Sequence, residues 1–230
     1  CSLQHLSAAA QIDLKQATLL EQLQHLGKVQ PEQIMPPLLG PVWGYRRKAR
    51  LGVKYVTKKQ TVLVGFREQH SSWLAELTRC EVLHPTVGER LLALRDLIAQ
   101  LDARDQIAQL EVAVDDTHTA FIFRNLIPLN DRDRQLLCEF AQAHDNFCYL
   151  QPTGPHSITP LWPPDLSLSS LEYHLPLDNL SIRFAPQDFT QVNAEINVQM
   201  VRQALTWLEP HPHETLLDLF CGLGNFTLPL

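Results

Sequence analysis

The stretch "LLDLFCGLGNFTLPL", residues 216–230, carries the strongest fold signal in the sequence. Its apolar beginning is typical of a buried strand, and Gly222 and Gly224 follow directly. Because glycine has no side chain, the backbone can turn tightly there and approach a ligand closely before a helix begins. The order of strand, glycine loop and helix predicts the start of an α/β Rossmann-like domain that binds a cofactor.

The residues around the two glycines indicate the kind of cofactor. Asp218, at the end of the predicted strand, is placed to accept a hydrogen bond from a ribose or an amino group. A dinucleotide fingerprint requires a third glycine where Thr227 stands, and Asn225 and Phe226 would crowd a pyrophosphate. The pattern therefore favours S-adenosylmethionine, and an ordinary glycine turn between a strand and a helix is the alternative.

Upstream of this loop, strands and helices mix without strict alternation, which predicts an α+β central domain. We expect this domain to span residues 1–180 and the cofactor-binding domain, of which the glycine loop is the first part, to span residues 181–230. Predicted helices cover residues 10–26, 86–101, 131–144 and 193–208. Predicted strands cover residues 45–56, 61–67, 109–116, 118–125, 147–151, 171–177, 180–185 and 215–220. Residues 152–170, rich in proline and serine, are expected to be irregular.

Positive charge is concentrated between Trp43 and Arg67, a window with eight basic and no acidic residues. The rest of the chain has 11 basic and 25 acidic residues. The net charge is therefore +8 in the window and −14 outside it. Such a stripe predicts a directed contact with a polyanion such as RNA, and a solvated edge strand is the alternative. Alternation along "RRKARLGVK" places several cations on one strand face, with aromatic side chains nearby for stacking on unpaired bases. The candidate RNA contacts are Arg46, Arg47, Lys48, Arg50 and Lys54, and the candidate stacking residues are Trp43, Tyr45 and Phe66.

Composition excludes several classes of protein. With 45% hydrophobic and 19% charged residues in 230, the chain has the composition of a globular protein and not of a disordered one. No apolar run approaches the ~20 residues that a membrane span requires, and no signal peptide opens the chain. We therefore expect a cytoplasmic monomer without a membrane partner. Five scattered cysteines indicate reduced thiols or metal ligands instead of a disulfide framework.

Several of these motifs together resemble the RNA uracil-5-methyltransferases. The matching stretches are "GYRRKARLGVKY", "VGFREQHSS", "CEVLHP", "FTQVNAEIN" and "DLFCGLGNFTLPL". Over essentially the whole chain, the similarity is greatest to the iron–sulfur members of this family that act on 23S rRNA. The resemblance implies methylation of carbon 5 of a uridine, with a cysteine thiolate adding to carbon 6 and a base removing the carbon 5 proton. Such an enzyme needs an unpaired or extruded uridine.

The resemblance also implies roles for particular residues. Gln191, Phe220 and Asn225 match positions that bind S-adenosylmethionine, beside Asp218, Gly222 and Gly224 of the loop. Cys1 and Cys80 match the last two ligands of a 4Fe-4S cluster. The nucleophilic cysteine and the base would lie beyond Leu230, so no catalytic residue is expected here. We predict that this fragment alone is inactive and binds no cluster stably.

Other interpretations accompany these. Cys221 is expected to be a small buried group and not the nucleophile, and Cys138 and Cys148 are expected to be core residues. Asn193 is as well suited to capping the helix that follows as to binding a cofactor. The alternative functions are methylation of tRNA and a non-catalytic RNA-binding module. An electron-transfer iron–sulfur protein is disfavoured by residues 216–230.

Overall fold

The computed structural model describes residues 2–177 and 179–230, and the chain divides into two compact units, Cys1–Val42 and Trp43–Leu230. The first unit contains helix α1 (Ala8–His25), which confirms the first predicted helix. Ser7 caps it, because its hydroxyl accepts a hydrogen bond of 3.3 Å from the amide of Ala10. No residue of α1 is buried.

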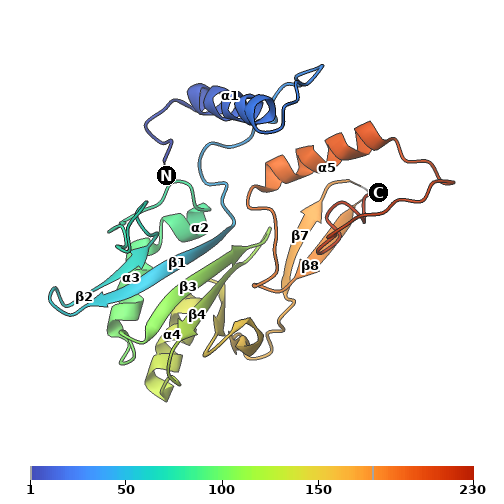
Figure 1. Cartoon of the computed structure of the whole chain (residues 1–230). Helices are drawn as coiled ribbons and strands as arrows, with labels where there is room; N and C mark the ends of the chain where they lie inside the picture. Colours follow the sequence, from blue (N-terminus) through green and yellow to red (C-terminus); the bar gives the residue numbers. More distant parts are fainter. Residues whose placement is uncertain (1, 178) are drawn as a thin grey trace. The chain divides into compact units, whose positions relative to one another are not determined.

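The second unit is built on a six-stranded sheet with the strand order β2-β1-β3-β4-β5-β6 (Figure 1). Its strands are β1 (Lys48–Val56), β2 (Thr61–Gly65), β3 (Ile107–Val114), β4 (Thr119–Asn125), β5 (Asn146–Leu150) and β6 (Thr159–Trp162). Only β4 and β5 pair in parallel; the other neighbours are antiparallel. Both predicted hairpins, β1–β2 and β3–β4, are confirmed, as is the α+β class.

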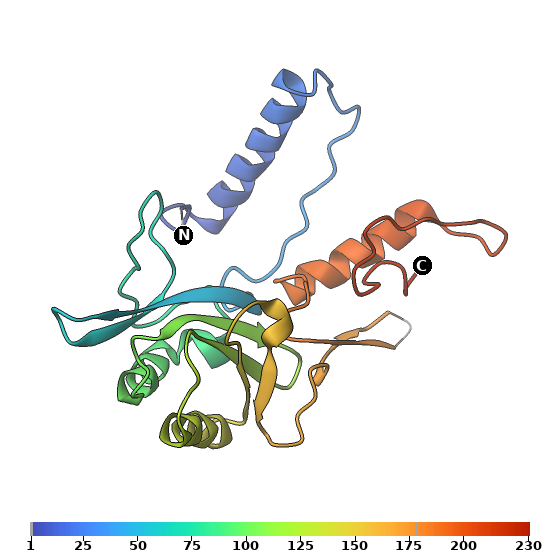
Figure 2. The same ribbon diagram turned by 60° about the horizontal axis from the view of Figure 1, so that its bottom comes forward.

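One face of this sheet is covered by α3 (Leu91–Gln100) and α4 (Asp131–Ala143), as Figure 2 shows. The alternation of β1 sends Ala49, Leu51 and Val53 into the core beneath these helices. Asn130 caps α4 by accepting a hydrogen bond of 2.8 Å from the amide of Asp133. Asn130, directly before the first helical residue, is thus the N-cap of α4.

The opposite face carries a second, smaller core around Ile122 and Tyr149. It is completed by Leu171 and Phe184 from a separate antiparallel pair, β7 (Leu171–Leu175) and β8 (Leu180–Phe184). Helix α5 (Ala194–Leu208) follows and confirms the helix predicted there. This second core joins the β7–β8 hairpin to the face formed by β4 and β5. The division into domains at residues 180 and 181 stays a prediction.

Two predicted segments differ from the structure. The helix predicted over residues 86–101 is divided into α2 (Pro85–Gly88) and α3, since the chain leaves helical geometry at Arg90. Residues 152–170 are not wholly irregular, because they contain a 3-10 turn (Pro155–Ser157) and strand β6. β6 is a strand because it pairs with β5, and this pairing cannot be inferred from the proline-rich segment alone.

The strand predicted over residues 215–220 does not form. None of the described strands pairs with it, and Leu217 and Leu219 are exposed. A strand of a parallel sheet obtains its hydrogen bonds and its burial from neighbours, so an apolar run without them stays irregular. Helix-like bonds from the amide of Leu228 to Gly224 (2.9 Å) and from Leu230 to Phe226 (3.1 Å) follow the loop.

Candidate cofactor and RNA-binding sites

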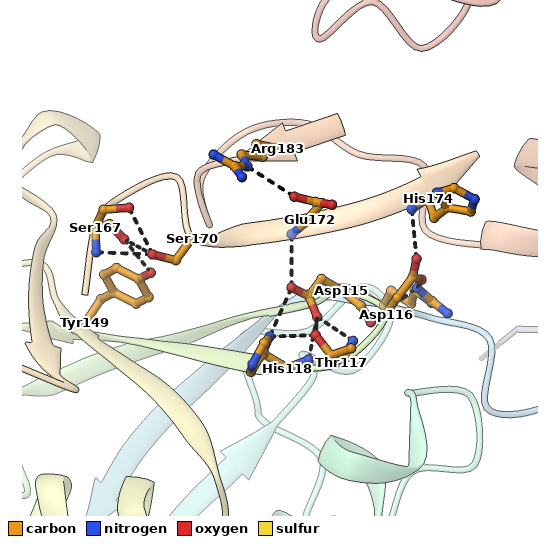
Figure 3. A network of polar contacts seen from close by, with 11 residues as sticks. Asp115, Asp116, Thr117, His118, Tyr149, Ser167, Ser170, Glu172, His174 and Arg183 are labelled. Carbon is orange, nitrogen blue, oxygen red and sulfur yellow. Dashed lines mark hydrogen bonds and ion pairs between the residues drawn. The ribbon is translucent and has the colours of Figure 1, made fainter. Parts of the chain in front are cut away.

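The turn between β3 and β4 fastens the β7–β8 hairpin to the main sheet (Figure 3). The buried carboxylate of Asp115 accepts hydrogen bonds from the amides of Thr117 (2.7 Å) and His118 in its own turn. It also accepts a bond of 3.0 Å from the amide of Glu172 on β7. A charged acceptor thus satisfies amides of two segments that are far apart in the sequence.

Asp116, the next residue, joins the same hairpin to the start of β1. Its carboxylate accepts a bond of 2.8 Å from the amide of His174 and pairs with the guanidinium of Arg47 at 2.5 Å. The Arg47 amide donates to the carbonyl of Val192 at 3.0 Å. Arg47, a candidate RNA contact, therefore also holds the β7–β8 hairpin and the segment before α5 together.

Gln191, a candidate cofactor residue, lines a small pocket at this junction. The pocket is also lined by Arg47, Asp116, Tyr173, His174 and Asn197. Burial raises the pKa of Tyr173, so its phenol stays protonated and able to donate. The structure thus brings Gln191 beside a residue of the basic strand.

Asn225, from the glycine loop, reaches the same group of residues. Its amide exchanges two hydrogen bonds of 2.8 Å with the amide of Asn197, and the Tyr173 hydroxyl donates to its oxygen at 3.1 Å. Asn197 is buried on α5. Neither Asn197 nor Tyr173 could be singled out from the sequence, because both belong to ordinary helix and strand patterns.

The other candidate cofactor residues do not join this group. Asp218 accepts a hydrogen bond of 2.5 Å from the Thr227 hydroxyl and lines a different hollow with His211 and Glu214. Phe220 is fully exposed. Gly222 and Gly224 have φ values of +58° and +86°, the left-handed geometry for which glycine is suited. Gln191 and the two partners of Asn225 thus line one pocket, while Asp218 and Phe220 lie outside it.

Asn193 caps α5, since its side-chain oxygen accepts a hydrogen bond of 3.2 Å from the amide of Ile196. The capping interpretation of this residue is therefore confirmed. No contact in the described chain assigns it a second role.

The described cysteines are unpaired and differ in exposure. Cys148 is buried on β5, as predicted, and burial raises its pKa; Cys138 on α4 is partly buried. Cys221 is exposed, so its prediction as a buried group is wrong: the strand that would cover it does not form. Cys80 is partly exposed, and its amide donates to the Gly88 carbonyl at 3.1 Å.

Of the two predicted cluster ligands, the structure describes Cys80. Cys1 lies outside the described residues. Within residues 2–177 and 179–230, no three His, Cys, Asp or Glu side chains gather as metal ligands would. The described residues therefore do not form a cluster site by themselves.

The basic strand places its cations as the alternation predicts. Lys48, Arg50 and Lys54 lie on the face of β1 opposite the core, and Arg50 pairs with Glu111 at 3.0 Å while 69% of its side chain is exposed. Lys48 donates to the Asp188 carbonyl, and burial lowers its pKa. Arg46 is half-buried, and its backbone bridges Leu83 and Asn193. The most exposed of the candidate RNA contacts are thus Arg50 and Lys54.

Aromatic residues near this strand differ from the expected set. Trp43 is exposed, whereas Phe66 packs partly against the core. Trp73, 68% exposed, lies beneath Lys54, whose Nζ atom is 5.5 Å from the ring centroid. The sequence signal for Trp73 was a large aromatic residue within the polar stretch "EQHSSW".

Among the described residues, none of the helices has both the length and the apolar character that a membrane span requires.

A family pattern and whole-chain comparison both indicate similarity to uracil-5-methyltransferases. The family pattern described as tRNA (Uracil-5-)-methyltransferase matches residues 170–230. A protein of Nitrosococcus oceani named 23S rRNA (uracil(1939)-C(5))-methyltransferase RlmD is 54% identical over all of this chain. A protein of the same name from Alkalilimnicola ehrlichii is 51% identical, and the chain covers 51% of each of these two relatives.

A solved structure of similar fold supports the architecture. One such structure is that of the Pyrococcus abyssi tRNA (uracil-54, C5)-methyltransferase in complex with S-adenosyl-L-homocysteine. The match covers all of the present chain and 55% of the Pyrococcus chain, with a TM-score of 0.65. At 19% identity, this match shows the fold alone. The chain spans about half the length of the curated relatives it matches. Over its full 230 residues, the chain is a relative of the RNA uracil-5-methyltransferases, and it is closely similar to members named for 23S rRNA.

Proposed function

We propose that this chain is part of an enzyme that methylates carbon 5 of a specific uridine in 23S rRNA. The observation that carries the proposal is identity of 47 to 54% to proteins named for that reaction, extending over the whole chain. It includes both the basic strand β1 and the glycine loop. An enzyme that acts on rRNA would work in the cytoplasm, and we propose that it does so as a monomer.

The cofactor of this enzyme would be S-adenosylmethionine, which supplies the methyl group when bound. Gln191 and Asn225 would hold it, because Gln191 lines the same pocket as Tyr173 and Asn197, and Asn225 is hydrogen-bonded to both of these residues. Gly222 and Gly224 would let the backbone approach the ligand without side-chain interference. Asp218 and Phe220 would contribute only after the loop rearranges, since they now face elsewhere.

The RNA would be bound in part by the exposed face of β1. Arg50 and Lys54 are the most exposed of its candidate contacts, and phosphate contacts of this kind position RNA without reading its sequence. Arg47 is engaged with Asp116, so its contribution would be mainly structural. The nucleophilic cysteine and the base would belong to the part of the parent enzyme that residues 1–230 do not include.

A 4Fe-4S cluster is the second cofactor we propose for the enzyme, with Cys1 and Cys80 as two of four ligands. Two thiolates alone do not hold such a cluster. The chain of residues 1–230, purified anaerobically, should therefore be colourless and contain no stoichiometric iron. About four irons per chain would contradict this expectation.

The experiment that tests the function uses the intact parent enzyme with RNA that contains 5-fluorouridine. Fluorine at carbon 5 cannot leave as a proton does, so the methylated adduct should remain covalently attached and migrate as one band. The proposal fails if no covalent complex forms with 23S rRNA fragments while the enzyme is folded. A complex with tRNA but not with rRNA would support the tRNA alternative.

A further inference from the structure

We propose that Trp73, supported by Lys54, is a stacking platform for one unpaired RNA base. This proposal rests on the proposed function and deepens it, because it assigns a base-stacking site on the open face of β1. The two side chains already form a cation–π pair in the structure.

The backbone around Trp73 is held firmly by a short antiparallel hairpin that continues from β2. The Trp73 carbonyl accepts a hydrogen bond of 3.0 Å from the amide of Glu68, and its own amide donates to the Ser71 hydroxyl at 2.9 Å. One residue further, Leu74 bridges Arg67, and the Ala75 amide donates to Phe66 at 2.9 Å. The indole is therefore presented on a fixed backbone although most of its surface is exposed.

Gly52 explains why this hairpin lies against the outer face of β1. A Cβ atom added there would be 2.5 Å from the Leu74 Cδ2 atom, so the leucine occupies the space that a side chain would need. Leu74 thus fits over Gly52, and its neighbour Trp73 comes to lie beside Lys54, two residues along the same strand face. The site depends on the sequence of both segments.

The chemistry of the site fits a nucleotide in single-stranded RNA. An exposed aromatic ring stacks on the face of any base, and a cation beside it neutralises the adjoining phosphate. Lys54 and Arg50 supply positive charge on the same face, within a stretch from residue 43 to 67 that contains no acidic residue. A base inside a duplex is already stacked on its neighbours, so the platform selects unpaired RNA.

The test is fluorescence anisotropy with the chain of residues 1–230 and a labelled, unstructured RNA of about twelve nucleotides, with all variants compared at the same series of salt concentrations. Trp73→Ala should weaken binding by about five- to tenfold, whereas Trp73→Phe, which keeps an aromatic face, should keep most of the affinity. Lys54→Ala should weaken binding and lower the dependence of affinity on salt by about one counterion.

Trp207→Ala is the matched control, because Trp207 is 60% exposed on α5, far along the chain from this site. Thermal unfolding of each variant, followed by circular dichroism, checks that it is folded. The inference is overturned if Trp73→Ala binds within twofold of the unchanged chain, if Trp207→Ala loses as much, or if duplex RNA binds equally well. These failures leave the trapping experiment on the parent enzyme untouched, so the two proposals fail separately.

Discussion

The carboxylate of Asp115 shows how much can depend on one buried side chain. It is 1% exposed and accepts bonds from two amides of its own turn and one of β7. Asp115→Ala removes the acceptor and leaves these donors unsatisfied within the protein. We expect the free energy of unfolding to fall by about 2–4 kcal/mol, measured by urea unfolding.

Asp105 provides the control for that change, because it is an exposed aspartate in the same region of the chain. Asp105→Ala should change the free energy of unfolding by less than about 0.5 kcal/mol. Equal losses in both variants would mean that the network of Asp115 contributes no stability of its own.

The cysteines should differ in reactivity because their surroundings differ. Burial raises the pKa of the Cys148 thiol, so it holds its proton at pH 8 and is shielded from reagents. Cys221 is exposed. After brief iodoacetamide treatment at pH 8, peptide mass spectrometry should find Cys221 alkylated and Cys148 unmodified. In urea both should react, and early modification of Cys148 would show that β5 opens readily.

At the scale of elements, the contact between α2 and the Cys80 segment depends on a glycine. A Cβ atom at Gly88 would lie 2.2 Å from the Cys80 carbonyl oxygen, a backbone atom that cannot move without shifting the segment. Gly88→Ala should therefore lower the free energy of unfolding by about 1–3 kcal/mol and increase the accessibility of the Cys80 thiol. The measurements are urea unfolding and the rate of alkylation.

Gly154→Ala is the matched control. Nothing lies within 4 Å of a Cβ atom at that position, and its φ of −89° suits alanine. This variant should be as stable as the unchanged chain or slightly more stable. Similar destabilisation of both variants would disprove the steric explanation for Gly88.

Elements stabilised by local contacts were predictable, whereas two segments whose state depends on distant partners were not. The β1–β2 hairpin follows from its own alternation and its polar turn "TKKQ". In contrast, β6 exists because β5 lies beside it, and the apolar run at residues 215–220 stays without a strand partner among the described residues. Local sequence encodes the tendency to pair, whereas the partner is set by the whole fold.

At the scale of the whole chain, the contacts of Asn225 join the last segment to α5. We expect Asn197→Ala, which removes both 2.8 Å bonds of the amide pair, to release residues 209–230. Limited proteolysis should then cut faster after residue 208, while the core sheet stays resistant. Thr206→Ala, another polar position on α5, is the control, and unchanged cleavage in Asn197→Ala would contradict the link.

The candidate sites were predictable to different degrees. Gln191 and Asn225 were singled out from their motifs; Gln191 lines the same pocket as Tyr173 and Asn197, and Asn225 is hydrogen-bonded to both. Their supporting residues could not be found from the sequence, because the contact depends on how β7, α5 and the loop meet. In the basic strand, alternation identified the exposed face but not that Arg47 would pair with Asp116.

The parallel pairing of β4 with β5 has a consequence for the order of folding. Strands β3 and β4 are joined by a short turn, so they can pair within microseconds. Strand β5 can join only after α4 has crossed from one end of the sheet to the other, and loop closure over that distance is slower. Because β5 supplies Tyr149 to the second core, we expect the face that receives β7 and β8 to mature last. During synthesis, β5, the β7–β8 hairpin and α5 all emerge before the segment that carries the glycine loop, so the surface that receives Asn225 can form before that segment arrives.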